Sequence, residues 1–187
     1  MKRKLKIAPT TMAITLAEAK AQCIVEHSDD DALLEGLIKS AQDYAEQYLG
    51  FAITEQTHTY SFDNFPVALS IKCPNITSVV ITYDDEDNVE QTLNSNKYWI
   101  DDIVHPASIT ARETWPETYD KPNAVRVDIT SGESNLDYVP AAIKQAILLL
   151  IAHGYANREA EIIGSITSNL KLGVEQFLDA YRVPLCV

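Results

Sequence analysis

The chain has 187 residues, of which 46% are hydrophobic and 22% are charged, so it is long enough and apolar enough to fold around a sizeable core. Its net charge of -12, from 27 acidic and 15 basic residues, disfavours broad, non-specific binding to the phosphates of DNA. The longest apolar run, residues 146–152, is too short to cross a bilayer, and the charged first residues lead into no apolar signal-peptide segment. We therefore expect the chain to stay in the cytoplasm unless a larger assembly carries it out.

The N-terminus is a local exception to the acidic balance. Four basic side chains stand within the first six residues: Lys2, Arg3, Lys4 and Lys6. A short run of like charges at a chain end is usually solvated, so we expect a frayed terminus there. A nucleic-acid-binding arm is the alternative.

The first predicted elements are two helices. Thr15, followed three residues later by Glu18, is typical of a capping box and predicts a short helix over residues 16–24. A longer helix is predicted over residues 30–49, because apolar and aromatic side chains recur there at helical spacing. That buried stripe should consist of Leu34, Leu37, Ile38, Ala41, Tyr44, Ala45 and Tyr48.

Polar residues mark both ends of the second helix. Ser28 or Asp29 is the expected N-cap, and Gly50 stands where a glycine commonly ends a helix. The acidic residues of its first turn are explained by the helix dipole, which favours negative charge at the N-terminal end.

From residue 51 the spacing of apolar residues changes from 3.6 to 2, which predicts strands. The expected strands cover residues 53–62, 69–73, 79–83, 89–93, 98–100 and 125–130. The acidic residues 84–88 should form a hairpin turn. Residues 106–123, which include Pro116 and Pro122, are predicted to be a loop with a short strand near Ile109.

The helical spacing returns at Pro140, a favourable first residue of a helix. The helix predicted over residues 140–158 is apolar nearly all round between residues 146 and 152, so it should be central and covered on most sides. Residues 160–172 are expected to form a mobile loop before a last short helix over residues 174–181.

This order of elements predicts an α+β fold. Residues 1–50 and 138–187 should form a small bundle of about four helices, and residues 51–137 should form an antiparallel β-sheet inserted between the second and third helices. We expect one folding unit overall.

Motifs for catalysis or cofactor binding are absent from the sequence. It has no nucleophile elbow, phosphate-binding loop or dinucleotide fingerprint, and its histidines and cysteines lack metal-binding spacing. These scattered residues are His27, His58, His105, His153, Cys23, Cys73 and Cys186. Cys23 and Cys73 are best explained as small core residues, and His153 as a structural histidine. The sequence thus predicts no catalytic residue, no cofactor and no metal, and leaves open whether Trp99 and Trp115 belong to the core or to an interface.

One acidic cluster leaves an enzymatic alternative. Asp84, Asp85, Glu86 and Asp87 could bind a cation in a metal-dependent hydrolase. The cluster lacks the alternating oxygen ligands, the central glycine and the distal glutamate of an EF-hand loop. A solvated hairpin turn is therefore the expected role.

Several segments, taken together in order and spacing, resemble one protein family. They are LAEAK at residues 16–20, DDDALL at 29–34, the pattern over 38–50, QT at 56–57, FP at 65–66, Pro74, SV at 78–79, PNAVRV at 122–127, VP at 139–140, IKQAILLL at 143–150, residues 153–159, and residues 174–182. The chain resembles the head–tail connector proteins of long-tailed bacteriophages, also called adaptor or head-completion proteins, in the subgroup with a β-rich insertion.

The resemblance implies a structural subunit rather than an enzyme. Such subunits form a ring, with twelve copies on the portal as one option, that docks under the portal, extends the DNA channel and offers a surface for tail attachment. The implied partners are other copies of the chain, the portal protein, a tail-completion or stopper protein, and genomic DNA that passes without specific binding. The implied location is the head–tail junction of the virion, after assembly in the host cytoplasm, with no membrane involved. Another neck or tail-completion protein is the alternative.

Overall fold

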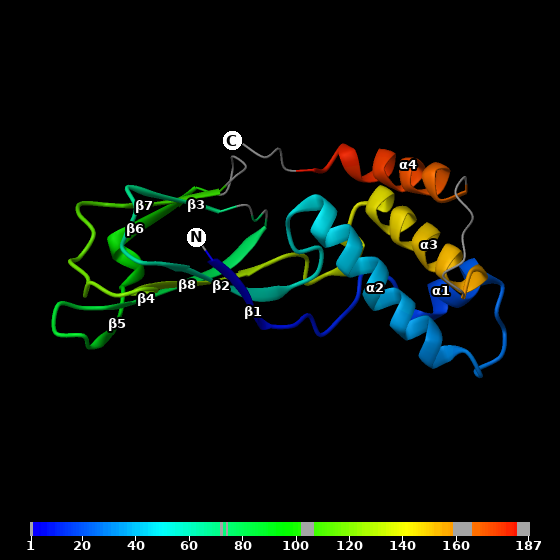
Figure 1. Cartoon of the computed structure of the whole chain (residues 1–187), viewed down its shortest axis with the longest axis horizontal. Helices are drawn as coiled ribbons and strands as arrows, with labels where there is room; N and C mark the ends of the chain where they lie inside the picture. Colours follow the sequence, from blue (N-terminus) through cyan, green and yellow to red (C-terminus); the bar gives the residue numbers. More distant parts are fainter. Residues whose placement is uncertain (1, 72, 74, 102–106, 159–165, 183–187) are drawn as a thin grey trace. The chain divides into compact units, whose positions relative to one another are not determined.

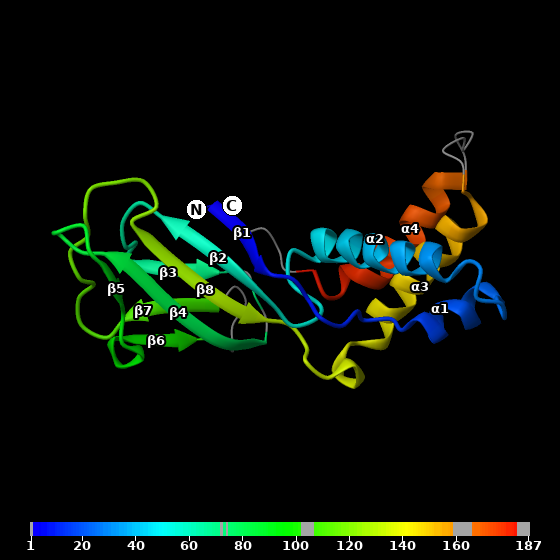
Figure 2. The same cartoon turned by 90° about the horizontal axis from the view of Figure 1, so that it is seen from below.

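The computed structural model of the protein describes residues 2–71, 73, 75–101, 107–158 and 166–182. The chain divides into two compact units, one built mainly of strands and one of helices (Figures 1 and 2). The sheet unit comprises Met1–Thr10 and Glu55–Ser134, and the helical unit comprises Thr11–Thr54 and Asn135–Val187. The fold is α+β, and all described strands except the first are inserted between the second and third helices, as predicted. The first ten residues, however, belong to the sheet unit and not to the helices.

The strands of the sheet unit form two antiparallel sheets, where the sequence suggested one. Within the described residues, the larger sheet has the strand order β1-β2-β8-β4-β5 and the smaller has the order β3-β7-β6. The strands are β1 (Lys2–Ile7), β2 (Gln56–Phe62), β3 (Ala68–Ile71), β4 (Ile76–Asp84), β5 (Glu90–Thr92), β6 (Tyr98–Asp101), β7 (Ala107–Ala111) and β8 (Val125–Ser131). A short 3-10 helix, η1 (Ser95–Lys97), precedes β6. The predicted short strand near Ile109 is confirmed as β7.

Apolar and polar residues alternate strictly along β8, and this alternation determines which face of the larger sheet is buried. Its apolar residues lie on one face and are fully buried, while Arg126 and Asp128 on the other face are only half-buried. The buried face forms one core with the smaller sheet: Tyr60, Leu69, Cys73, Ile81, Tyr98, Ile109, Val125, Val127 and Ile129. Fully burying one such aliphatic side chain contributes about 1.5–3 kcal/mol.

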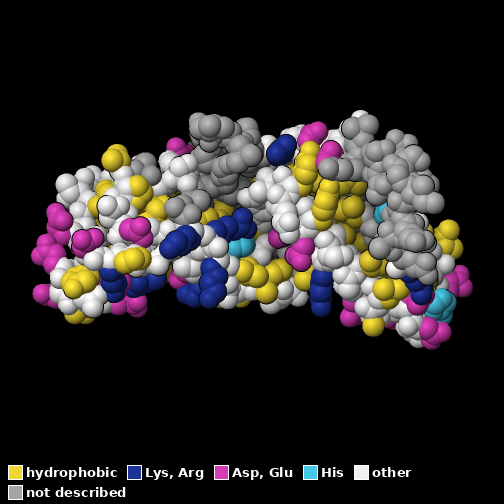
Figure 3. All heavy atoms as spheres, viewed as in Figure 1, with side chains coloured by type: hydrophobic (Ala, Val, Ile, Leu, Met, Phe, Trp, Pro, Cys, Tyr) yellow, Lys and Arg dark blue, Asp and Glu magenta, His cyan; other side chains and the backbone are white. Residues whose placement is uncertain are grey.

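The basic N-terminal segment forms an ordered strand at one edge of the larger sheet, so the expectation of a frayed terminus is wrong. β1 pairs antiparallel with β2. Lys6 Nζ lies 2.6 Å from Asp128 Oδ2, and Arg3 Nη2 donates a hydrogen bond to His58 Nε2 at 2.9 Å. Figure 3 shows Lys and Arg side chains gathered over this part of the sheet unit. Strand pairing and these two contacts offset the low strand propensity of a lysine-rich segment.

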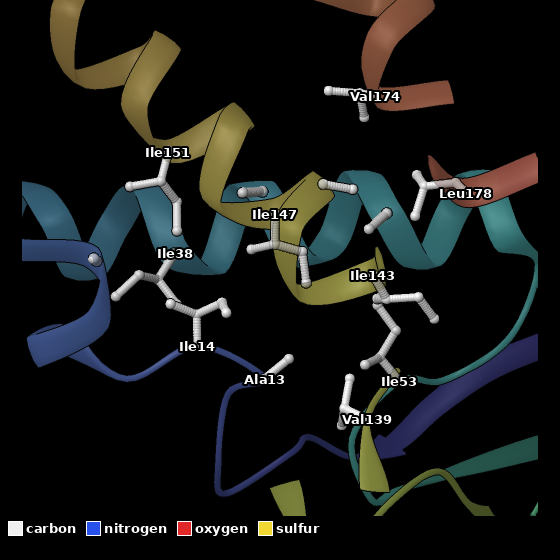
Figure 4. Close-up of a cluster of buried hydrophobic side chains, with 14 of the residues drawn as sticks. Ala13, Ile14, Ile38, Ile53, Val139, Ile143, Ile147, Ile151, Val174 and Leu178 are labelled. Carbon is white, nitrogen blue, oxygen red and sulfur yellow. The ribbon is translucent and has the colours of Figure 1, made fainter. Parts of the chain in front are cut away.

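The helical unit packs four described helices around a second core (Figure 4): α1 (Leu16–Cys23), α2 (Asp31–Leu49), α3 (Ala141–Ala156) and α4 (Ile166–Asp179). A short 3-10 helix, η2 (Leu136–Tyr138), precedes α3. Ile143, Ile147 and Ile151 recur every four residues on α3 and are buried. Ile147 and Ile151 project from α3 toward Ile14 and Ile38, and Ile143 lies beside Ile53 (Figure 4). α3 is therefore the central helix of this unit.

The cover over α3 is less complete than the sequence suggested. Leu148, Leu149 and Leu150 pack against the core but stay half-buried in this single chain. Despite its apolar composition, α3 is too short to span a bilayer, and no other helix in the described part of the chain is long and apolar enough to do so.

α1 begins at the predicted capping box, which is confirmed. Thr15 Oγ1 accepts a hydrogen bond from the backbone N–H of Glu18 at 3.2 Å, and the Glu18 carboxylate accepts one from the Thr15 N–H at 2.7 Å. These bonds satisfy two backbone N–H groups that a helix start otherwise leaves unpaired. The helix ends at Ile24, which adopts a left-handed conformation with φ of 56°.

α2 differs from the prediction in its N-cap residue and in one residue of its predicted buried stripe. Its N-cap is Asp30, which makes no side-chain capping bond, and not Ser28 or Asp29. Gly50 ends the helix as expected, with φ of 84°, a conformation that glycine adopts at little cost. The aliphatic members of the predicted stripe lie in or against the core, but Tyr44 is 38% exposed. The prediction of a buried stripe on α2 is thus confirmed for the side chains that pack toward α3 and wrong for Tyr44.

α4 starts earlier than predicted. Residues 166–172, expected to lie in a mobile loop, are helical, whereas residues 160–165 of that loop lie outside the described part of the chain. Val174 and Leu178 of α4 are buried in the helical core (Figure 4). Their burial stabilises a helix whose first residues have low intrinsic helix propensity.

Candidate functional site

The acidic cluster that sequence reasoning singled out begins with a carboxylate held in ion pairs. Asp84, at the end of β4, is buried, and both of its oxygens accept hydrogen bonds from Arg126, at 2.8 and 3.1 Å. Lys121 Nζ lies 3.0 Å from Asp84 Oδ2. Hydrogen bonds from Arg126 are the main cause that lowers the pKa of Asp84 to about 2. This carboxylate therefore holds the fold together and is not free to bind a cation.

The next acidic residue shapes the hairpin turn. The Asp85 carboxylate accepts hydrogen bonds from the backbone N–H of Val89 at 2.9 Å and of Asp87 at 3.1 Å, which lower its pKa. Asn88 has φ of 60°, as tight turns often require. Among the described residues, no three acidic, histidine or cysteine side chains lie close enough together to hold a metal ion. The Asp84 carboxylate thus belongs to an ion-pair network, and the Asp85 carboxylate shapes the turn.

The acidic start of α2 joins three helices. Asp30 accepts hydrogen bonds from Tyr155 Oη at 2.6 Å and from Arg158 Nη2 at 2.9 Å, which lower the pKa of Asp30. Asp31 pairs with Lys20 of α1 at 2.7 Å. These contacts tie α2 to the end of α3 and to α1, a structural role beyond the predicted interaction with the helix dipole.

Of the histidines, His58 has the most unusual surroundings. It is buried on β2, and burial together with the charge of Arg3 lowers its pKa to about 4. Because Nε2 accepts a hydrogen bond from Arg3, the neutral ring carries its proton on Nδ1, which has no partner among the described residues. His153 Nδ1 lies 3.2 Å from the Asn157 amide nitrogen at the end of α3, a structural contact as predicted. His105 lies outside the described residues.

The cysteines occupy structural positions where they are described. Cys73 is buried, and its Sγ lies 3.0 Å from Tyr60 Oη. Cys23 is half-buried against the helical core, and burial raises the pKa of its thiol. Both therefore fit the prediction of small core residues, while Cys186 lies outside the described part of the chain.

The two tryptophans have different roles, which the sequence could not distinguish. Trp115 packs against the core of the sheet unit and stacks on Phe65, with ring centroids 4.7 Å apart. Trp99 on β6 is 58% exposed and lines a groove of about 560 Å³ between β4 and β6. Arg112 Cζ lies 3.8 Å from the centroid of the Trp99 ring. An exposed Trp stacked with Arg is typical of residues that bind other proteins.

The helical unit carries a second exposed aromatic surface, on α2 and α4. Tyr44, Phe177 and Tyr181 are each about two-fifths exposed. Tyr48 Oη donates a hydrogen bond to Asp179, and Arg182 Cζ lies 5.1 Å from the centroid of the Tyr48 ring. Aromatic and arginine side chains of this kind are enriched where proteins meet.

Sequence reasoning had named no interface residue, and the structure supplies candidates in three places: β1, the β4–β6 groove and the α2–α4 surface. One sequence pattern could have revealed the first. Lys4, Leu5, Lys6 and Ile7 alternate in polarity, which is typical of a strand. The other two surfaces arise only when segments distant in sequence meet, so no local pattern marks them.

Comparison with known proteins points to one kind of assembly. Residues 13–98 match the family described as phage gp6-like head–tail connector protein. A chain in the structure of the neck of an empty gene transfer agent (GTA) particle, computed with C6 symmetry, has a TM-score of 0.80 at 17% identity over 100% of this chain and 98% of that chain. Chains from the virion of a native GTA particle and from its neck computed with C12 symmetry have TM-scores of 0.79 and 0.78, each at 16% identity with the same coverage. Comparison with curated protein sequences gave no match.

The fold and these matches define a class of protein, the structural connectors of phages and phage-like particles. Residues 13–98 match the phage gp6-like head–tail connector family, which bears out the predicted resemblance to head–tail connector proteins. The family match carries this assignment, and the solved structures show that the fold is shared along the whole chain. The function that follows is structural, in agreement with the resemblance and not with the hydrolase alternative.

Proposed function

We propose that the chain is a subunit of a closed ring at the head–tail junction of a phage or phage-like particle. The family match to head–tail connectors is the observation that carries this proposal. The similar chains come from particle necks computed with C6 and C12 symmetry, which supports a ring of identical subunits. Twelve copies on the portal would fit the higher of these symmetries.

A ring of this kind acts through contacts between protein surfaces and not through catalysis. The half-buried leucines of α3, the exposed aromatic residues of α2 and α4, and Trp99 of β6 are apolar areas that a neighbouring protein can cover. We assign these areas to contacts with other copies of the chain, with the portal protein above the ring and with a stopper or tail-completion protein below it. The ring then joins the head to the tail.

The acidic charge suits a channel for DNA. A net charge of -12 repels the phosphate backbone, so a lumen with acidic walls lets genomic DNA pass without binding it specifically. The proposed location is the virion neck, after assembly from subunits in the host cytoplasm and without a membrane. A neutral or basic inner wall in a structure of the ring would contradict this part of the proposal.

The test is to find the chain in particles and to see what fails without it. Purified chain is analysed by size-exclusion chromatography with light scattering and by negative-stain microscopy, and purified particles are probed with an antibody to the chain. We expect closed rings in the first experiment, or rings once portal protein is added, and label at the neck in the second.

Deletion of the gene should give filled heads and separate tails. Absence of the chain from purified particles would overturn the proposal. Label at the tail end of the neck, together with tails that stay bound to heads in the deletion strain, would favour another neck or tail-completion protein.

A further inference from the structure

At each edge of the larger sheet, part of the outermost long strand has no neighbouring strand among the described residues. β1 forms one edge. At the other edge β5 pairs with residues 82–84. The Leu93 N–H donates a hydrogen bond to the Ile81 carbonyl at 2.8 Å, and Tyr98 Oη donates one to the Val79 carbonyl at 3.1 Å, so within the described residues only the first few residues of β4 have neither a strand nor such a contact beside them. Figure 2 shows β2 and β8 lying between β1 and β4. Uncovered strand edges are natural places for pairing with a second chain.

The first residues of β4 also form one wall of the Trp99 groove. The groove of about 560 Å³ is lined by Ile76 and Val79 of β4 and by Trp99 and Ile100 of β6. Arg112 stacks on Trp99 and donates a hydrogen bond from Nε to the Tyr98 carbonyl at 3.3 Å, which fixes the aromatic ring in place. A rigid, exposed aromatic wall loses little conformational entropy when a partner covers it.

β1 offers one apolar side chain, Leu5, on the face that matches this groove. Leu5 is 46% exposed, whereas Ile7, which is 56% exposed, lies on the other face because the register shifts between the two residues. Leu5 stands opposite His58, whose side chain is buried on the face that packs toward the smaller sheet. Since side chains alternate between the two faces of a strand, Leu5 lies on this same face. Val79, which lines the groove, stands opposite buried Ile129 and therefore lies on the same face of the larger sheet as Leu5.

Strand direction favours a second copy as the occupant. Each strand of the larger sheet is antiparallel to its neighbour, so β1 and β8 run one way and β2 and β4 run the other. If a second copy lies beside the first in the same orientation, its β1 is antiparallel to β4 of the first copy. A rotation that keeps strand direction then repeats the contact from copy to copy, as a closed ring requires.

The charges of β1 and of the hairpin after β4 favour the same antiparallel alignment of β1 with β4. The apolar end of β1, with Leu5 and Ile7, meets the start of β4, where the groove lies. The basic end, with Lys2 and Lys4, lies toward the end of β4 and the hairpin that carries exposed Glu86 and Asp87. Opposite charges at this end favour one direction of approach over the reverse.

We propose that β1 of one copy docks in the groove between β4 and β6 of the next copy, so that the larger sheets follow one another around the ring. The inference rests on the proposed function only in requiring that copies of the chain form a ring. It assigns a specific contact within that ring.

Cysteine cross-linking in assembled particles tests the contact. The double variant Leu5→Cys/Ile100→Cys places one thiol on the groove-facing side of β1 and one in the groove, and mild oxidation should give a ladder of covalent oligomers on a non-reducing gel. The control Leu5→Cys/Val67→Cys keeps the same native cysteines and moves the second thiol to a side chain that is 95% exposed outside the groove. We expect no ladder from the control.

The outcomes separate the two proposals. Particles that contain the variant chain but give no ladder above the control overturn the docking contact and leave the ring proposal intact. Absence of the chain from particles, together with no ring from the purified protein and portal, overturns the proposed function and the contact with it.

Single substitutions give a second measurement on the ring or on the portal-bound complex. Trp99→Ala should weaken association at least tenfold, about 1.4 kcal/mol, while the matched control Val67→Ala leaves it unchanged. Lys4→Glu should weaken it and reduce its salt dependence, while Lys39→Glu makes the same charge change on the exposed side of α2 and should do neither. Association within twofold of the unmodified chain for both Trp99→Ala and Lys4→Glu would overturn the inference.

Discussion

Arg126 on β8 holds the Asp84 carboxylate at the end of β4 through two hydrogen bonds, one from each terminal nitrogen of the guanidinium group. Arg126 also reaches Glu90 of β5 at 2.6 Å, so one side chain connects three neighbouring strands. Bidentate pairs of this kind are stronger and more directional than single ion pairs. The start of the acidic hairpin is thereby fixed to the sheet, which explains why the charge of Asp84 is structural.

Asp84→Asn should destabilise the sheet unit by about 2 kcal/mol, because it leaves the Arg126 and Lys121 charges without their shared, buried partner. Glu90→Gln is the matched control, since Glu90 contacts the same arginine from an exposed position and should cost less than about 0.5 kcal/mol. Urea denaturation followed by circular dichroism measures both. Equal losses for the two variants would show that burial of Asp84 does not matter.

Two helical glycines should respond in opposite directions to alanine. A Cβ at Gly154 of α3 would lie 2.7 Å from Leu37 Cδ2 of α2, whereas a Cβ at Gly36 meets no atom within 4 Å. Gly36→Ala should stabilise the protein by about 1 kcal/mol through helix propensity, and Gly154→Ala should destabilise it by about 1 kcal/mol because the contact with α2 outweighs that gain. Thermal denaturation measures the difference.

The explanation for Gly154 can be tested by a double variant. In a Leu37→Ala background the contact is gone, so Gly154→Ala should become neutral or stabilising. Destabilisation that persists in this background would place the cause outside the pair.

The regular elements could be predicted from the sequence because their periodicity is local. β8 alternates cleanly, and α3 combines helical spacing with an apolar composition. β1 was missed because four charged residues among its six obscure the alternation, and only pairing with β2 makes it a strand. The same limit applies to the candidate surfaces. Trp99 could be noticed in the sequence, but its exposure depends on β4 and β6, which come together only in the fold.

Thr15→Ala should reduce stability by about 1 kcal/mol, because the start of α1 loses one half of its capping box. Thr114→Ala, which removes an exposed threonine hydroxyl from a loop of the sheet unit, is the control and should change stability by less than about 0.5 kcal/mol. Thermal denaturation of the two variants distinguishes a helix-cap effect from a general effect of losing a threonine.

The capping box also has a pH dependence of known sign. Hydrogen bonds with Thr15 lower the pKa of Glu18 below its ordinary value of 4.5. This part of the stability is therefore present above pH 4.5 and lost as the pH falls through the lowered value. The difference between the unmodified chain and Thr15→Ala should shrink in acid, and a difference that grows there would contradict the assigned bonds.

His58 should make the sheet unit sensitive to mild acid. Its pKa is about 4 in the folded chain against an ordinary value of 6.5, so the unfolded chain binds the proton more tightly. Stability is then constant above about pH 6.5 with respect to this group and falls as the pH drops from 6.5 toward 4. Because protonation would also put a second charge beside Arg3, the loss should be accompanied by release of β1 from β2.

The measurement is the free energy of unfolding across this pH range for the unmodified chain and for His58→Gln, which keeps an acceptor for Arg3 but cannot titrate. We expect the advantage of the unmodified chain over His58→Gln to decrease by about 2 kcal/mol between pH 7 and pH 4.5, while His27→Gln, which removes an exposed imidazole, follows the unmodified chain. After correction for the intrinsic pH dependence of exchange, the protection of the β1 amides should fall over the same range in the unmodified chain and in His27→Gln, but not in His58→Gln. An advantage that does not change with pH would mean that the His58 ring is as accessible to protons in the folded chain as in the unfolded one.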